Sequence, residues 1–175
     1  MKIKFLVLFL CGAVLLCCGD DPKSEIKVEN QEQSEGHSRI TAKTIEDLKY
    51  TDYVLSSEAE DVVSTWEKYR ELDTQISYLK KADFSFFNGD IELLTKFIDG
   101  FKAGLPENLK TNPIISRVAI IETALLKLNE NLTLDNIKRK DKLFGIKEVL
   151  VSFANLNYQI NKKLERDMFD KIQPE

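Results

Sequence analysis

The segment NPIISRVAIIETALLKL, residues 112–128, decides the fold of this chain. Its apolar residues follow one another at alternating steps of four and three, namely Ile114, Val118, Ile121, Leu125 and Leu128. This spacing places the five side chains on one face of an α-helix, as in the seam between the helices of a bundle. Asn112 as the cap and Pro113 at the first helical position predict where the helix begins, and residues 129–131 predict its end.

Three other long segments carry the same helical period. The first is expected over residues 57–81, because Ser57 and Glu60 match a capping box. The second has its inward face over residues 86–101 and ends at Gly104, where we expect a left-handed residue. The last begins at Asp135 or Asp141, two starts between which the sequence does not choose, and carries an apolar stripe from residue 146 to residue 164.

A short additional helix is expected at Thr44, and patterns typical of strands are nearly absent. The sequence therefore predicts an all-α protein, an antiparallel four-helix bundle with up-down topology over residues 44–175. Residues 1–17 and 18–43 form two preceding segments with a different composition.

Residues 1–17 have the features of a bacterial signal peptide. Lys2 and Lys4 form a basic start, and residues 5–16 are an almost unbroken apolar run. This run is shorter than the about 20 residues that a transmembrane helix needs. A plain secretory signal with incidental cysteines is one interpretation, and the residues at its end favour another.

The run ends in Leu15-Leu16-Cys17-Cys18, which resembles the lipobox of bacterial lipoproteins. In that family, signal peptidase cuts before a cysteine whose thiol receives diacylglycerol, with palmitate-type acyl chains. Cys18 fits this pattern best, because Leu15 stands three residues before it and the small Cys17 directly before it. Cleavage at Cys17 would instead place the bulky Leu16 at the cut. The resemblance implies lipidation of Cys18 and a membrane anchor.

The residues after Cys17 indicate the location of the protein in the cell and the length of its linker. Cys18-Gly19-Asp20-Asp21 resembles the export signal of surface lipoproteins of the Bacteroidetes, and an acidic start to a solvated linker is the alternative. The resemblance implies the bacterial cell envelope, most readily the outer membrane, with a periplasmic or a surface-exposed domain. Residues 18–43 are polar and have no aromatic side chain, so they predict a flexible linker that spans roughly 25–30 Å.

Two segments of the helical part support this view. The residues FFNGDIELL (86–94) and IKEVLVSFANLN (146–157) resemble a family of small lipoproteins from flavobacteria. That resemblance covers most of the mature chain. It implies an envelope location and a helical fold, and it implies no activity.

The residue types needed for most catalytic and metal sites are missing from residues 44–175. All three cysteines precede residue 19, and the single histidine, His37, lies in the linker. This composition excludes His-containing di-iron sites, haem attachment motifs and ordinary zinc sites. No EF-hand spacing, Gly-x-Ser-x-Gly turn or P-loop is present. We therefore expect a domain that is not an enzyme and has no cofactor or metal.

Charge argues against a nucleic-acid partner. Cleavage before Cys18 leaves 23 basic and 29 acidic residues, so the net charge changes from −4 to −6. An acidic domain without a dominant basic face lacks the electrostatic attraction that nucleic-acid binding requires. The expected partners are the membrane, through the lipid anchor, and an unidentified protein.

Three groups of side chains have both a structural and a functional interpretation. Asn157 and Glu122, on or beside apolar stripes, either line a ligand pocket or fix helix register. A basic cluster either contacts lipid or glycan anions or is simply solvated; it comprises Lys138, Arg139, Lys140 and Lys142. An aromatic set either forms a binding patch or fills the core; it comprises Trp66, Tyr69, Phe84, Phe86 and Phe87.

Taken together, the sequence predicts a membrane-anchored envelope lipoprotein whose helical domain is not an enzyme and binds an envelope or extracellular partner. The alternative is a carrier or sensor that holds a small ligand or a lipid in an apolar pocket between helices.

Overall fold

The computed structural model describes residues 39–172. The signal peptide, Cys18 and His37 lie outside these described residues. Within them the regular secondary structure is entirely helical, which confirms the all-α prediction. The α-helices are α3 (Ala42–Glu46), α4 (Ser57–Val63), α5 (Glu67–Lys80), α6 (Ile91–Ala103), α7 (Asn112–Thr133) and α8 (Arg139–Ile172), with a 3-10 turn at Glu107–Leu109.

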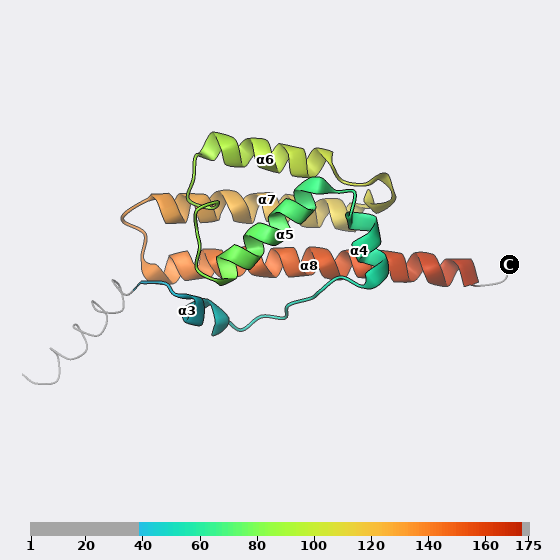
Figure 1. The fold of residues 1–175 in the computed structure, drawn as a ribbon, viewed down its shortest axis with the longest axis horizontal. Coiled ribbons are helices and arrows are strands. Elements are labelled where there is room, and N and C mark those ends of the chain that lie inside the picture. The colour runs from blue at the N-terminus through green and yellow to red at the C-terminus, as the bar shows by residue number, and fades with distance from the viewer. Residues whose placement is uncertain (1–38, 173–175) are drawn as a thin grey trace, which may run out of the picture. The chain divides into compact units, whose positions relative to one another are not determined.

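The pair formed by α7 and α8 is the centre of the fold. A short connection joins the two helices, which lie side by side and antiparallel along most of α7 (Figure 1). Helix α6 packs against α7, and α5 runs obliquely in front of the pair and contacts α6. The short helices α3 and α4 both contact α5 and α8. Helix α8 continues beyond α4 at its C-terminal end (Figure 1).

The core contains residues from every helix. Leu125 of α7 is fully buried, and Phe153 of α8 stacks on Tyr69 of α5 with ring centroids 5.4 Å apart. Among the described residues, every buried side-chain nitrogen and oxygen has a hydrogen-bond partner. The stripes that were read from the sequence in α7 and α8 therefore face the interior, as predicted.

Truncation of the core side chains Leu125 and Phe153 tests this packing. We expect either Leu125→Ala or Phe153→Ala to lower the free energy of unfolding by about 2–5 kcal/mol, because burial is lost and a cavity remains. Thermal melting followed by circular dichroism measures the change. Lys138→Ala and Lys140→Ala are the controls and should shift stability by less than about 0.5 kcal/mol. Equal effects in both groups would contradict the assignment of the core.

The expected helix over residues 57–81 is interrupted at residues 64–66. Ser64 and Thr65 donate side-chain hydrogen bonds to the carbonyls of Asp61 and Val62, at 2.6 and 3.3 Å, which compete with the helical pattern. Trp66 follows with φ −90° and ψ 83°, outside the helical region, and its side chain is fully buried. The chain therefore turns to place the indole in the core.

Helix α5 ends in a conformation that its sequence does not favour. Ala82 has φ 62°, and the amide of Asp83 donates to the carbonyl of Tyr78 at 3.0 Å, as in a Schellman motif. A left-handed alanine costs roughly 1–2 kcal/mol because its Cβ crowds the following carbonyl. The expected end of the helix at residue 81 agrees with this turn, but the sequence pattern gives no sign of its strain.

Replacement of Ala82 by glycine should relieve this strain. We expect Ala82→Gly to raise the free energy of unfolding by about 0.5–1 kcal/mol, since the gain exceeds the added entropy of the unfolded chain. Urea unfolding measures the difference. The matched control is Ala119→Gly, at an exposed helical position of α7, which should lower stability by about 0.5–1 kcal/mol. A loss of stability in both variants would contradict the strained turn.

Gly104 is not left-handed, contrary to the expectation. Its φ is −78°, and a Cβ at this position would lie 3.1 Å from Cδ1 of Trp66 and 3.2 Å from the carbonyl oxygen of Gly100. The glycine is therefore needed for the close approach of the tryptophan ring and not for backbone conformation.

Other predicted helix ends shift by a few residues. Ser56, not Ser57, accepts the capping hydrogen bond of α4, from the amide of Ala59 at 3.3 Å. The cap of α7 is Thr111, not Asn112, so Pro113 occupies the second helical position and not the first. Helix α7 continues through residues 129–131 to Thr133, and α8 begins at Arg139, between the two predicted starts.

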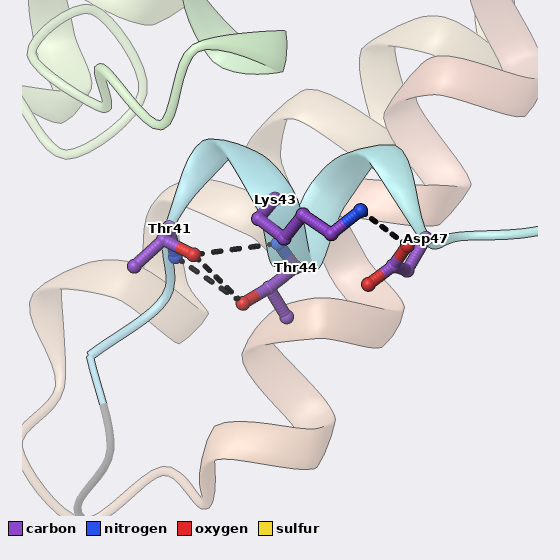
Figure 2. A network of polar contacts seen from close by, with 4 residues as sticks. All are labelled: Thr41, Lys43, Thr44 and Asp47. Carbon is purple, nitrogen blue, oxygen red and sulfur yellow. Dashed lines mark hydrogen bonds and ion pairs between the residues drawn. The ribbon is translucent and has the colours of Figure 1, made fainter.

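The described chain begins beside the N-terminal turn of α8. The hydroxyl of Thr41 accepts from the amide of Thr44 at 3.4 Å and caps α3, and Lys43 pairs with Asp47 at 3.6 Å (Figure 2). The guanidinium of Arg139 donates to Oγ1 of Thr44 at 3.4 Å. Ile40 is buried, so the packed body includes residues that precede the expected start at residue 44.

None of the helices between residues 39 and 172 is both long enough and apolar enough to cross a bilayer.

Candidate interaction surface

The segment between α3 and α4 is extended and is held along α8 by two asparagines one helical turn apart (Figure 1). Asn157 donates to the carbonyl of Tyr53 at 3.0 Å, and Asn161 donates to the carbonyl of Val54 at 2.8 Å. The side-chain oxygen of Asn161 also accepts from the amide of Ser56 at 2.9 Å. The two side-chain amides therefore supply hydrogen-bond partners to backbone groups of a segment that is not in a helix.

Asn157 also holds α5. The hydroxyl of Tyr69 donates to its side-chain oxygen at 2.7 Å, and burial raises the pKa of Tyr69, which keeps the phenol neutral as a donor. Asn157 lies at the wall of a polar surface hollow of 550 Å³, which it shares with Arg70 and Asp73. Burial also raises the pKa of the Asp73 carboxyl. Both polar atoms of Asn157 therefore make hydrogen bonds that join α8 to α5 and to the segment between α3 and α4. This structural role includes more than the helix register.

Glu122 has a simpler position. Its carboxylate pairs with Lys102 at 2.9 Å, which connects α7 to α6. The pair is partly exposed to solvent, so it contributes at most about 1 kcal/mol.

The aromatic set lies in the core. Trp66 and Phe87 are fully buried, and Phe86 meets both Phe87 and Phe97 edge to face, with centroids 5.1 and 5.0 Å apart. Phe84 is partly buried against the same cluster. These residues fill the space between α5 and α6 and do not form an exposed patch.

The sequence interpretation missed Asn129. This side chain is buried and donates to the carbonyls of Phe87 and Gly89 at 3.0 and 2.9 Å, so it fixes the turn before α6. Its position four residues after Leu125, on the buried stripe of α7, is the sequence signal by which it could have been found. The sequence pattern assigned residues 129–131 only to the end of the helix.

The groove with the largest volume among those described lies between α4 and the C-terminal part of α8. It encloses about 730 Å³, and Val62, Leu164 and Met168 supply its apolar surface. Lys163 and Asp167, which pair with each other, lie along it. Met168 is 51% exposed, and the nearby Phe169 and Ile172 are 58% and 72% exposed.

A second groove, of about 550 Å³, lies between α5 and α6. Phe86, Leu94 and Phe97 form its apolar surface. Lys68 and Lys96 are at its edge, and Lys68 is partly neutralised by Glu71 at 2.5 Å. Glu71 and Asp90 also line the groove, which therefore combines an apolar surface with charges of both signs.

Over residues 39–172, no group of three or more His, Cys, Asp or Glu side chains converges as a metal site would require. In the comparisons with known proteins, no family model, no curated protein and no solved structure matches this chain.

Proposed function

We propose that this protein is an envelope lipoprotein, anchored through Cys18, whose helical domain binds a protein partner and catalyses no reaction. The observation that supports the proposal is the C-terminal part of α8. This helix continues beyond α4 (Figure 1) with Met168, Phe169 and Ile172 exposed next to the α4–α8 groove. Apolar side chains gathered at the end of a helix are typical of contact surfaces between proteins.

The polar side chains inside the domain support its fold, which agrees with a role in binding and not in catalysis. Asn129, Asn157 and Asn161 hold turns and connections, and Glu122 joins two helices. Asn157 and Glu122 were the two candidates for a polar site, and both are engaged in contacts that support the fold.

We further propose that the long helices α5 to α8 form an up-down four-helix bundle. The α7–α8 connection is short, residues 134–138, which favours antiparallel neighbours, and the two helices have that arrangement (Figure 1). The oblique course of α5 is a distortion of this plan, and the break before Trp66 is the local cause that we assign to it.

The location that we propose is the outer membrane of a flavobacterium or a related bacterium, with the domain on the periplasmic or the surface side. Support comes from the lipobox at residues 15–18 and the acidic residues Asp20 and Asp21. Both lie in the part of the chain that precedes the described residues.

The partner surface is tested by two matched substitutions of exposed apolar residues. Met168→Glu changes the α4–α8 groove, and Leu93→Glu changes α6, where Leu93 is 69% exposed. After cross-linking in native envelopes, the wild type and Leu93→Glu should recover the same protein, and Met168→Glu should lose it. Recovery that is unaffected by Met168→Glu would contradict this surface.

The competing function is a carrier or sensor for a small amphipathic anion or a lipid. The α5–α6 groove favours it, because Nζ of Lys68 lies over the Phe97 ring, 5.3 Å from its centroid, and Lys96 lines the same groove. Native mass spectrometry of the purified protein separates the two functions. A co-purifying metabolite that is lost in Phe97→Ala would favour the carrier.

A further inference from the structure

The end of the body where the described chain begins is rich in cations. Arg39 is the first described residue, and α3 then contacts α8, where Arg139 reaches Thr44. The chain therefore enters the body beside the first turn of α8 and the α7–α8 connection (Figure 1). An anchor in the residues before Arg39 would therefore be connected to the helical domain at this end.

The charges at this end oppose the dipole of α8. Lys138 precedes the helix, Lys140 and Lys142 lie in its beginning, and Asp141 is the acidic residue of the first turn. The first turns of α4, α5 and α6 are instead acidic, as the helix dipole favours. A cation near a helix N-terminus is unfavourable by roughly 0.3–1 kcal/mol. Lysines at the start of α8 therefore work against the helix dipole, although the rest of the sequence supports the fold. Such a conflict between a local charge and the fold is expected at functional positions.

These lysines also lack internal partners. None of the ion pairs found between residues 39 and 172 includes Lys138, Lys140 or Lys142, whereas eight other lysines of that range are paired. Two apolar side chains flank them, since Leu134 is 45% exposed and Phe144 is 56% exposed. Unpaired lysines next to exposed apolar side chains are typical of surfaces that rest on anionic bilayers.

We propose that this basic end, defined by Leu134, Lys138, Lys140, Lys142 and Phe144, docks on the bilayer that holds the anchor and binds anionic lipid headgroups. The proposal rests on the proposed lipidation of Cys18. The chain from Cys18 to Arg39, 21 Cα–Cα steps, spans at most about 75 Å, so the anchor keeps the basic end near the membrane at high effective concentration. Each lysine at an anionic surface contributes about 1 kcal/mol of binding free energy. Three such contributions are sufficient for docking, because the anchor already holds the helical domain near the bilayer.

Docking at this end gives the body an orientation. Helix α8 has 34 residues and is therefore about 50 Å long, with the basic end at its start and the α4–α8 groove at its finish. The groove that we propose for the protein partner would face away from the anchoring bilayer.

The test uses the full-length lipidated protein in vesicles of phosphatidylcholine, with or without about 30% phosphatidylglycerol as the anionic lipid. Acetylation rates of Lys138 and Lys140 are measured by mass spectrometry, and the exposed Lys110, between α6 and α7, is the internal control. In anionic vesicles we expect Lys138 and Lys140 to react at least about threefold more slowly than in neutral ones, and about 0.5 M salt should restore their rates. Lys110 should react equally in both.

Two variants test whether this protection depends on the charge of the basic end. Lys142→Glu should remove most of the protection of Lys138 and Lys140, whereas Lys110→Glu should leave it unchanged. Equal rates in both kinds of vesicle, with the protein still floating with the lipid, would overturn membrane docking alone. Failure of the protein to float with either vesicle would instead overturn the anchor, and with it this proposal.

Discussion

Replacement of Trp66 by alanine is expected to lower the free energy of unfolding by about 3–5 kcal/mol, a large part of the about 5–15 kcal/mol that a domain of this size possesses. The indole is fully buried and stacks on Phe101 with centroids 4.6 Å apart. Its Nε1 donates to the carbonyl oxygen of Phe101 at 2.8 Å, so truncation also leaves a buried acceptor unpaired. Thermal melting by circular dichroism should show a fall of roughly 10–20 °C in Tm.

Two further variants separate the parts of this effect. Trp66→Phe keeps most of the ring and removes the donor, so it should cost about 1–3 kcal/mol. Tyr78→Ala removes an aromatic side chain that is 45% exposed, and it should cost less than about 1 kcal/mol. If Trp66→Ala and Tyr78→Ala were equally mild, the interruption between α4 and α5 would not be organised around the tryptophan.

Cys18→Ser should release the protein completely from the membrane fraction. Anchoring through acyl chains depends on a thiol, and each buried methylene contributes about 0.8 kcal/mol, so loss of two or three chains removes nearly all of the membrane affinity. Fractionation of envelopes followed by immunoblotting measures the distribution. The variant should also show the lower mass of an unmodified chain.

Cys17→Ser is the matched control for this experiment. Serine is also a small residue, so cleavage and lipidation at Cys18 should continue and the protein should stay in the membrane fraction. Release of Cys17→Ser together with retention of Cys18→Ser would move the cleavage site by one residue. Retention of both variants would contradict the lipoprotein assignment.

The helices were predictable where their apolar residues repeat without interruption. The stripe from Ile114 to Leu128 faces the core, and the Ala82 turn lies where the period of one helix stops. Period and burial are linked directly, because a helix of 3.6 residues per turn returns the same face every three or four residues. Helix ends were less predictable, since neighbouring residues such as Ser56 and Ser57 compete for one cap.

The break before Trp66 was not predictable from the period. Val62, Trp66 and Tyr69 continue the stripe of the preceding residues, so a straight helix and a broken one have the same pattern. What decides between them is the acceptor at the carbonyl of Phe101, which the chain brings close only in the folded state. Contacts between residues far apart in sequence cannot be read from local spacing.

The candidate polar residues show the same limit. Asn157 on an apolar stripe correctly indicated a buried polar contact, but its partners Tyr53 and Tyr69 come from two other segments. The extended segment between α3 and α4 has no period of its own, and only the two asparagines of α8 reveal that it is fixed. The surface grooves depend on how the helices cross, which the stripes do not specify.

The fixed segment between α3 and α4 has a mechanical consequence. If the protein is pulled through a membrane anchor, tension enters at Arg39 and reaches the contacts of α3 first, then the hydrogen bonds of Asn157 and Asn161 with residues 53–56. These contacts are few and break one after another, whereas α4 to α8 share a large core. Single-molecule pulling should show a small early extension before the main rupture, and its absence would contradict this order. Residues 40–55 would then lengthen by up to about 50 Å while the core formed by α4 to α8 stays folded, so this segment would extend first under load.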